Sequence, residues 1–394
     1  MKRLVLAGAG HAHARVLLDC VREPLPGVEL VVVSPHALAP YSGMVPGWLA
    51  GRYRLEEMVI DFAALCAAAR CRFVQAEMHA LDPDRQQLRL STGEVLGYDL
   101  LSLNVGSTVR PPRSAPGHVL AMRPLSELPA AYEAVLADWR QGPSHAPWTV
   151  TAVGGGPAGV ESLLAVLVRL RQLRPARTVH GSLVTQDVQL LPTVSSGARR
   201  AATHALGRAG VTVQLGSSWC TAMARSSELV LWATGAQAHD WQRDASRRGR
   251  LAVSDQGFVR IDAQLQSVSH PQVFATGDCA HWEVGPRPLR KAGVVAVRMA
   301  PVLSHNLHVL LAGRGRLEPY RPQQQFLVLM ATGDGRAIAS RGPVSAAGVW
   351  AWRWKDHIDR RFIRRHALPT STTGSATSSA TASDASTVHE RDAV

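Results

Sequence analysis

The sequence predicts an α/β fold in which two Rossmann-like dinucleotide-binding domains are followed by a small C-terminal α+β cap. Three observations support this prediction. The chain has 394 residues, of which 46% are hydrophobic, so it is long and apolar enough for two or three domains. Two segments each combine a strand, a glycine-rich turn, a helix and a second strand. A segment rich in tryptophan and arginine, with helical spacing, lies near the end of the chain.

Composition and charge exclude several classes of protein. Charged residues make up 19% of the chain, which fits a globular protein and excludes global disorder. The formal net charge is +13, and it indicates compositional bias as readily as an anionic partner. The five cysteines have no framework spacing, so we expect a reducing, cytoplasmic compartment. No uninterrupted run of about eighteen apolar residues occurs, so we expect no membrane-spanning helix.

The first strand-turn-helix unit begins close to the N-terminus. Its strand, helix and second strand are expected over residues 4–7, 12–21 and 29–33. The apolar start resembles a signal peptide, but it is short and ends in glycines, so it reads as a buried strand. Gly8 permits a tight turn, Gly10 lets backbone amides approach a pyrophosphate, and His11 stands where the helix begins. Ser34 follows the second strand, in the place where an acidic residue usually binds a ribose.

The second unit contains the complete glycine fingerprint. A strand over 148–153 precedes Gly154, Gly156 and Gly159, and a helix follows. This context predicts a second dinucleotide site. Glu161 falls in the first turn of the helix, where a carboxylate is favoured by the helix dipole or has a role beside the bound nucleotide.

Two later apolar runs end abruptly in a Thr-Gly pair. The first ends at Gly235, and the second ends at Gly277 followed by Asp278, where a strand opening can bind a hydroxyl-rich ligand. Together with the two glycine-rich turns, this order resembles the two-dinucleotide flavoproteins of the pyridine nucleotide:disulfide oxidoreductase superfamily, over about residues 4–311.

The resemblance implies that the chain binds FAD and uses NAD(P)H. The implied FAD contacts are Gly8, Gly10, His11, Ser34, Gly277 and Asp278. The implied NAD(P)H contacts are Gly154, Gly156, Gly159 and Gly235. We expect an FAD domain over 1–112 and 240–315, an NAD(P)H domain over 113–239, a cap over 316–367 and a disordered tail over 368–394. The choice between NADH and NADPH stays open, because no acid is clearly placed at the end of the second strand of the NAD(P)H domain.

Within the superfamily the chain is most similar to type II NADH dehydrogenases, and more closely to the flavoprotein module fused to selenide, water dikinase. This likeness is found in segments 39–47, 291–298 and 352–356. It implies hydride transfer from NAD(P)H to flavin, then electron transfer to a quinone or another small acceptor. Quinone is the less supported of these, because Arg298 and Met299 stand where quinone-reducing relatives tend to carry glutamines.

The candidate catalytic residues are Glu161, beside the nicotinamide, and Lys291, beside the flavin. For Lys291 the alternative is a solvated loop residue. The rival function is a flavin-binding accessory or sensor protein of selenium or sulfur metabolism with little turnover.

We expect neither a redox-active disulfide nor a metal site. In disulfide-reducing members a cysteine pair faces the flavin, and segment 41–46, which takes that place here, contains no cysteine. Cys66 and Cys71 are five residues apart and so would not share a helix face. His11 and His13 have no accompanying cysteine or histidine partners, so helix-start contacts to phosphate are the better interpretation.

The end of the chain is expected to form strands around a turn at 333–335, within residues 317–343, followed by a helix over 349–366. One face of the helix carries Trp350, Trp354, Ile358 and Phe362, and six basic residues fill much of the rest: Arg353, Lys355, Arg360, Arg361, Arg364 and Arg365. Such a helix packs on a core or lies on an anionic membrane surface, and both interpretations stay open. The second would place a cytoplasmic protein at the inner face of the cell membrane. We expect no nucleic-acid partner, and a homodimer is left open.

Overall fold

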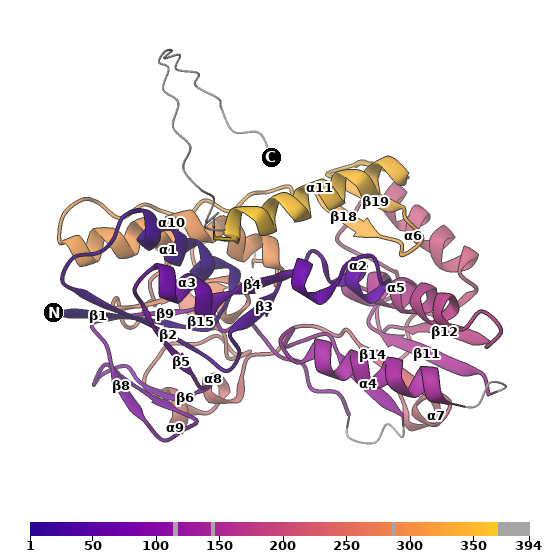
Figure 1. Cartoon of the computed structure of the whole chain (residues 1–394), viewed down its shortest axis with the longest axis horizontal. Helices are drawn as coiled ribbons and strands as arrows, with labels where there is room; N and C mark the ends of the chain where they lie inside the picture. Colours follow the sequence, from indigo (N-terminus) through magenta and orange to yellow (C-terminus); the bar gives the residue numbers. More distant parts are fainter. Residues whose placement is uncertain (113–116, 143–145, 286–288, 369–394) are drawn as a thin grey trace, which may run out of the picture.

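Two five-stranded parallel sheets form the frame of the protein, whose computed structural model describes residues 1–112, 117–142, 146–285 and 289–368 (Figure 1). The first sheet has the order β16 (Val273–Ala275), β9 (Leu100–Leu103), β1 (Lys2–Ala7), β2 (Val28–Ser34) and β5 (Arg72–Gln75). The second has the order β10 (His118–Ala121), β14 (Leu229–Trp232), β11 (Trp148–Val153), β12 (Val179–Val184) and β13 (Val211–Gln214). The predicted α/β fold class is confirmed.

The first sheet is buried on both faces, which explains its nearly continuous apolar strands. Leu4 to Ala7 of β1 and Val31 to Val33 of β2 are almost fully buried. The surrounding helices are α1 (His11–Arg22), α3 (Phe62–Ala68) and α10 (Gly293–Ala312). β16 comes from far along the chain, yet it pairs in parallel with β9 and thereby places Gly277 and Asp278 beside the first glycine-rich turn.

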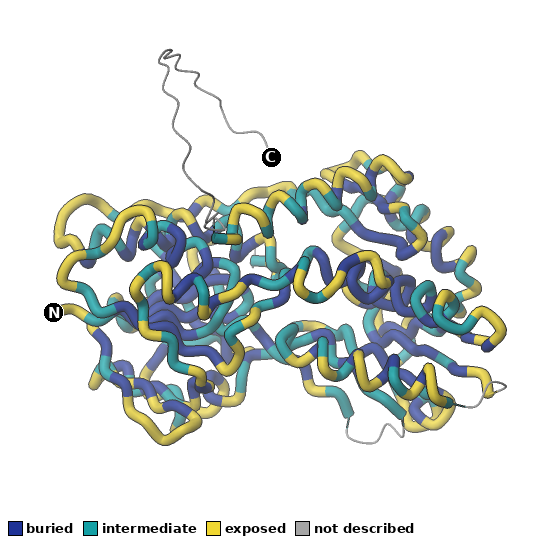
Figure 2. Tube along the Cα trace, viewed as in Figure 1, coloured by how far each residue is buried: buried dark blue, intermediate teal, exposed yellow. Residues whose placement is uncertain are grey.

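The second sheet repeats this arrangement around its own core, and Figure 2 shows buried segments in both halves of the molecule. Its helices are α4 (Leu128–Gln141), α5 (Pro157–Leu173), α6 (Ser196–Arg208) and α7 (Thr221–Arg225). α5 is apolar along most of its length because it packs against β11, β12 and β14.

Smaller elements connect and cover the two sheets. β3 (Leu38–Pro40) pairs with β4 (Val59–Asp61), β15 (Val259–Ile261) pairs with β17 (Ala280–Trp282), and β6 (Met78–Asp82), β7 (Gln87–Leu90) and β8 (Val95–Gly97) form an antiparallel meander. The short helices are α2 (Val45–Leu49), η1 (Leu55–Glu57), α8 (Asp240–Arg243), α9 (Ala245–Arg248) and η2 (Gly277–Cys279).

The C-terminal cap consists of an antiparallel sheet and one long helix. β18 (Val328–Ala331), β19 (Ala337–Arg341) and β20 (Val344–Gly348) precede α11 (Val349–His366), whose bounds agree with the predicted helix. The expectation of strands throughout 317–343 is wrong for 317–327, where no strand forms. β20 was missed because it begins just after that stretch. The expected tail lies, except for Leu368, outside the described residues.

α11 lies across the molecule and contacts β18 to β20 at one end and α1 at the other. Figure 1 shows it along the top of both halves. Its buried residues are Ala351, Lys355 and Asp359, whereas Trp350 and Trp354 are exposed. The predicted apolar stripe therefore does not coincide with the buried face, and Lys355 does not belong to the exposed basic residues. Lys355 can be buried because it forms an ion pair with Asp359, so that neither charge is left without a partner.

α10 is long and apolar enough to span a bilayer by length and composition alone. Half of its apolar window is buried within the protein, where it packs against α1.

Candidate functional site

A cavity of about 2750 Å³ is lined by residues at the carboxyl ends of strands in both sheets. Both glycine-rich turns line it, as do the start of α10 and one side of α11. In open α/β sheets, ligands bind at this end of the strands. The topology thus brings together segments that lie far apart in the sequence.

The first turn is held in place by Asn104, the residue that follows β9. Gly8 has a φ of +99°, and a Cβ there would lie 2.5 Å from the carbonyl oxygen of Asn104, so only glycine fits. The Asn104 side chain accepts a hydrogen bond from the Ala12 backbone N–H (3.1 Å) and donates one to the carbonyl of Thr276 (2.8 Å). Asn104 therefore connects the start of α1 with the end of β16. Sequence reasoning missed it, although a polar residue at the end of a buried strand is a usable signal.

The two histidines of the first turn have different environments. His11 lines the cavity, and its buried Nε2 has no hydrogen-bond partner in the part of the chain that the structure describes. Burial lowers the pKa of His11 to about 4, so the ring is neutral at pH 7. His13 is fully buried, and its ring nitrogens bond to the Gly8 carbonyl (2.7 Å) and the Ser102 hydroxyl (2.8 Å). The expected phosphate contact of His13 is therefore wrong, because this ring fills the space between helix and strand.

Ser34 stands at the end of β2 and also lines the cavity. Its hydroxyl donates a hydrogen bond to the carbonyl of His36 (2.9 Å), which stabilises the turn after the strand.

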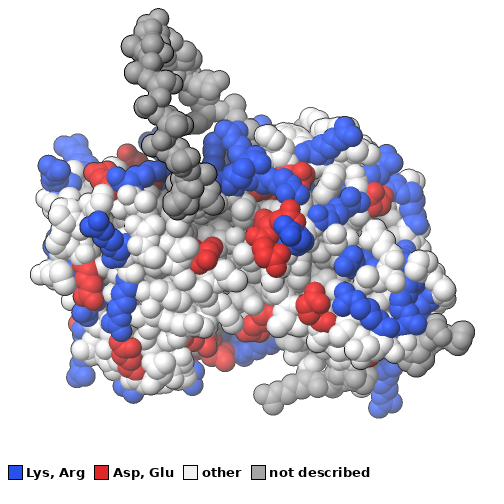
Figure 3. All heavy atoms as spheres, viewed as in Figure 1, with Lys and Arg blue, Asp and Glu red and all other residues white. Residues whose placement is uncertain are grey.

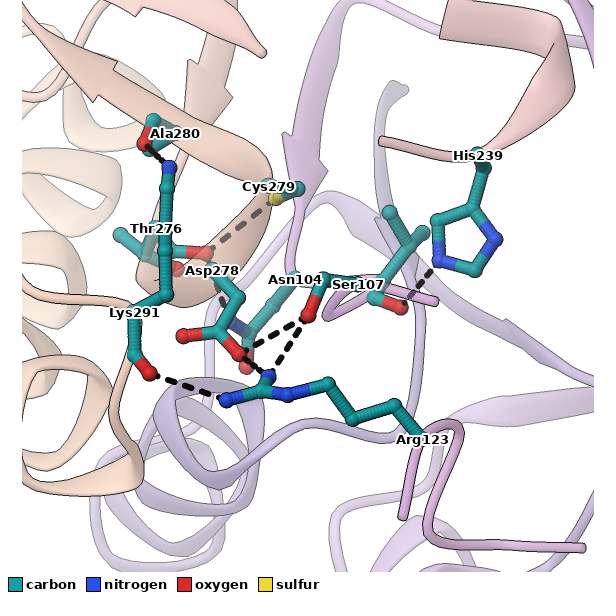
Figure 4. A network of polar contacts seen from close by, with 10 residues as sticks. Asn104, Ser107, Arg123, His239, Thr276, Asp278, Cys279, Ala280 and Lys291 are labelled. Atoms are coloured by element: carbon teal, nitrogen blue, oxygen red, sulfur yellow. Dashed lines mark hydrogen bonds and ion pairs between the residues drawn. The ribbon is translucent and has the colours of Figure 1, made fainter. Parts of the chain in front are cut away.

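Asp278 is the centre of a polar network that joins the first sheet to the segment after β10 (Figure 4). Its carboxylate accepts a hydrogen bond from Ser107 (3.0 Å) and forms an ion pair with Arg123. Arg123 also donates to the carbonyl of Lys291 (2.9 Å). Sequence reasoning missed Arg123, since nothing in the local sequence distinguishes it from other arginines.

Lys291 lines the cavity, but its ammonium group is directed away from Asp278 (Figure 4). The Nζ atom donates to the carbonyl of Ala280 (2.5 Å) and lies 3.5 Å from the centre of the Phe258 ring. Burial lowers the pKa of Lys291 to about 8. Lys291 is thus a half-buried cation with a defined hydrogen bond rather than a fully solvated loop residue.

The second turn provides an open approach to the helix start. Gly154 has a φ of +121°, and the absence of a side chain at Gly159 allows α5 to approach the Gly154 carbonyl closely. Gly156 precedes α5, lines the cavity and has no atom within 4 Å of a hypothetical Cβ. Gly235, after β14, lines the same cavity with the same open space. An anionic group can therefore reach the amides at the start of α5.

Glu161 lines the cavity and is held by the cap. Its Oε1 accepts a hydrogen bond from the backbone N–H of Ala331 (2.7 Å) at the end of β18. Burial raises the pKa of Glu161 to about 7, although the nearby Lys355 ammonium acts in the opposite direction. A carboxyl group that is half protonated near pH 7 can accept or donate a proton at this site.

Cys66 and Cys71 lie closer together than the sequence indicated. α3 ends before Cys71, and Arg70 adopts a left-handed conformation (φ +53°), so the Cys71 N–H bonds to the Cys66 carbonyl (2.8 Å). This helix-ending motif brings the two side chains into contact, and the Cys66 thiol raises the pKa of Cys71. The expectation that the residues stay apart assumed a continuous helix. Neither is among the described residues that line the cavity.

Over residues 1–112, 117–142, 146–285 and 289–368, no three side chains of His, Cys, Asp or Glu gather in a way that could hold a metal ion.

The chain matches known proteins over most of its length. A family model described as pyridine nucleotide-disulphide oxidoreductase matches residues 2–300. The type II NADH:quinone oxidoreductase Ndh of Mycobacterium tuberculosis is 28% identical over 52% of this chain and 48% of its own length, so the chain spans about half of that relative. Putidaredoxin reductase CamA of Pseudomonas putida is 26% identical over 71% of this chain and 67% of its own length.

The structure of NDH2 from Plasmodium falciparum in complex with NADH has a TM-score of 0.72 at 13% identity, covering 92% of this chain and 98% of that one. This likeness shows a shared fold.

The residues of the cavity fit the cofactors of this family, FAD and NAD(P)H. Two helix starts are open to anionic groups, and four buried polar atoms of the cavity wall have no hydrogen-bond partner among the described residues: His11 Nε2, Trp232 Nε1, Arg298 Nε and the Tyr320 hydroxyl. Since the family model extends over both glycine-rich turns and the Thr-Gly-Asp segment, the chain belongs to the pyridine nucleotide-disulphide oxidoreductase family.

Proposed function

We propose that the chain is an FAD-dependent NAD(P)H:acceptor oxidoreductase that passes electrons to a quinone or another small acceptor. The observation that supports this most is the single cavity lined by both glycine-rich turns. When bound, FAD accepts a hydride from NAD(P)H and passes two electrons on. The rival accessory or sensor role in selenium or sulfur metabolism draws no support from the relatives.

The residues of each half would bind one nucleotide. For FAD, we assign Gly8, Gly10, His11, Ser34, Gly277 and Asp278, and the domain over 1–112 and 240–315. For NAD(P)H, we assign Gly154, Gly156, Gly159 and Gly235, and the domain over 113–239. The cap over 316–367 would cover the reaction site, because Glu161 receives a hydrogen bond from its first strand.

Two residues would act on the reacting groups. Glu161 would exchange a proton within the cavity, and its pKa of about 7 supports this role. Lys291 would contribute a half-buried positive charge near the start of α10, which favours negative charge on a neighbouring group.

Rapid mixing of flavin-loaded protein with NADH or NADPH tests the proposal. An oxidoreductase must lose its flavin absorbance near 450 nm at least as fast as it turns over. The nucleotide that bleaches the flavin faster identifies the preferred co-substrate. A flavin that stays oxidised with both nucleotides would contradict the proposed function.

We also propose that α11 holds the protein at an anionic membrane surface. Trp350 and Trp354 are 51% and 37% exposed. Lys and Arg side chains gather over the edge where α11 lies (Figure 3), and the exposed ones on α11 are Arg353, Arg361, Arg364 and Arg365. Tryptophan beside arginine is typical of helices that lie in a lipid headgroup layer. A homodimer remains a prediction without a contact that supports it.

A further inference from the structure

Three residues that the proposed reaction does not yet use form a buried polar cluster beside the cavity. Lys355 of α11 donates a hydrogen bond to Asp359 Oδ2 (2.6 Å) and another to the carbonyl of Gly43 (2.5 Å). The Tyr41 ring and the Asp359 carboxylate both lie beside Gly43, and burial together with this carboxylate raises the pKa of the Tyr41 hydroxyl. The side chains of Lys355 and Asp359 are each only 6% exposed. Such a buried pair is costly to maintain unless it has a use or excellent partners.

The cluster lines the cavity. Tyr41, Lys355 and Asp359 all line the cavity, together with Glu161. A Cβ on Gly43 would lie 2.7 Å from the Tyr41 ring and 2.8 Å from Asp359, so glycine is required for these two side chains to meet.

Other titratable groups face the cluster from three helices. His11 of α1 lies edge-on to Tyr41 (5.5 Å between ring centres), and its lowered pKa keeps it neutral at pH 7. Both members of the ion pair change the pKa of Glu161 on α5: Lys355 lowers it and Asp359 raises it. On α11 itself, Asp356 raises the pKa of Asp359. His366 contacts Phe362, which stacks on Tyr41.

A second cluster of similar composition, with arginine in place of lysine, lies one turn away on α11. The Tyr53 hydroxyl donates to Asp356 (2.6 Å), and Asp356 pairs with Arg360 (2.9 Å). None of these three is among the described residues that line the cavity. Of these two Tyr-Asp-cation clusters, only the one formed by Tyr41, Asp359 and Lys355 lines the cavity.

The proposed reaction requires a proton that the co-substrate does not supply. NAD(P)H gives up two electrons and one proton, whereas reduction of a quinone to a quinol consumes two electrons and two protons. The second proton must come from the protein and be replaced from solvent. A one-electron carrier protein requires no such proton.

We propose that Tyr41, Asp359 and Lys355 deliver this second proton, and that the acceptor is therefore a small two-electron acceptor of the quinone class. The Tyr41 hydroxyl gives its proton to an acceptor oxygen as that oxygen is reduced. A proton moves from the Lys355 ammonium through the Asp359 carboxylate to the Tyr41 oxygen, and solvent reprotonates Lys355. This inference rests on the proposed function, because it concerns the acceptor step of the same site.

Two double variants of the full-length, flavin-loaded protein test the inference. Tyr41→Phe with Asp359→Asn alters the cavity cluster, and Tyr53→Phe with Asp356→Asn makes the same chemical changes in the control cluster. Each protein is reduced with dithionite, so the assay does not depend on NAD(P)H. Reoxidation is then followed with a water-soluble benzoquinone and with ferricyanide, which takes up electrons without protons.

We expect the ratio of the quinone rate to the ferricyanide rate to fall on the order of 100-fold in the cavity variant, the usual size of a general-acid effect. The ratio should stay near the wild-type value in the control variant. A ratio that changes equally in both variants, or in neither, would overturn the inference. If the double variant loses its flavin, Tyr41→Phe alone, which leaves the Lys355 and Asp359 pair intact, gives the same readout.

A second measurement needs no turnover. In protein labelled with [13C]glutamate, infrared spectroscopy follows the protonated carboxyl band of Glu161, which should titrate near pH 7. Asp359→Asn should move this midpoint to lower pH, because Asp359 raises the pKa of Glu161. Asp356→Asn should leave it in place. An unchanged midpoint in Asp359→Asn would show that Asp359 does not act on the cavity, even if NAD(P)H reduces the flavin normally.

Discussion

The partly buried carboxyl group of Glu161 should make the stability of the protein depend on pH, and Glu161→Gln should remove that contribution. The pKa of Glu161 is raised from 4.5 to about 7 by burial. A carboxyl group whose pKa is higher in the folded state favours folding below pH 4.5, and this contribution is lost as pH rises through 7. With 1.36 kcal/mol for each pKa unit, the loss amounts to about 3 kcal/mol by pH 8. Glutamine keeps an acceptor for the Ala331 N–H but carries no ionisable proton.

Urea unfolding of wild type and Glu161→Gln at pH 5, 6, 7 and 8, followed by tryptophan fluorescence, measures this effect. All other titrating groups are shared, so they cancel when the two proteins are compared at each pH. Relative to wild type, the variant should become more stable by about 2.5 kcal/mol between pH 5 and pH 8, because a small part of the effect falls below pH 5. Parallel pH profiles for the two proteins would refute the reasoning, because Glu161 would then have the same pKa in the folded and unfolded chains.

Four further predictions concern the nucleotides, the cysteines and the membrane. Asp278→Ala should lower FAD affinity tenfold to a hundredfold, because a charge-assisted hydrogen bond is worth about 1.5–3 kcal/mol, and absorbance near 450 nm after gel filtration measures it. Gly156→Val should abolish flavin reduction by NAD(P)H while the flavin content stays normal, and the opposite result would mean that the two sites are exchanged. Cys66→Ser with Cys71→Ser should keep turnover close to wild type, and a folded, flavin-loaded but inactive variant would overturn this. Changing the four exposed arginines of α11 to glutamine should release the protein from anionic liposomes, since each contributes about 1 kcal/mol at low salt, and wild-type protein that stays unbound at low salt would contradict the membrane proposal.

The strands and turns of both Rossmann-like halves were predictable because their signals are local. A strand buried on both faces needs an apolar run, and a close turn before a helix needs glycine. The predicted strand over 148–153 and the predicted helix over 349–366 agree with β11 and α11. The expected strands throughout 317–343 failed over 317–327, where apolar residues do not form a paired strand.

The residues that hold the first turn in place were not predictable, because their roles depend on contacts across the sheets. Asn104 serves the turn only because β9 lies between β1 and β16. Arg123 reaches Asp278 only because the segment after β10 passes beside the end of β16. Cys66 and Cys71 meet because Arg70 adopts a left-handed backbone conformation. Arginine rarely adopts this conformation, so the sequence gives no signal that predicts it.

The face of α11 shows most clearly why pattern alone was insufficient. The apolar residues of α11 repeat every four positions, which predicts that Trp350 and Trp354 face the core. Lys355 is then expected on the exposed face, because an isolated charge is costly to bury. That assumption fails when the neutralising partner is one turn away on the same helix, as Asp359 is for Lys355. The sequence of such a pair is identical to that of an exposed i,i+4 pair, which many surface helices carry. Only the loop that contains Tyr41 and Gly43, far away in the sequence, distinguishes the two cases, because its Gly43 carbonyl accepts a hydrogen bond from Lys355 and its Tyr41 lies beside Asp359. A buried ion pair completed by a distant loop is therefore better evidence for a functional cluster than the composition of its own helix.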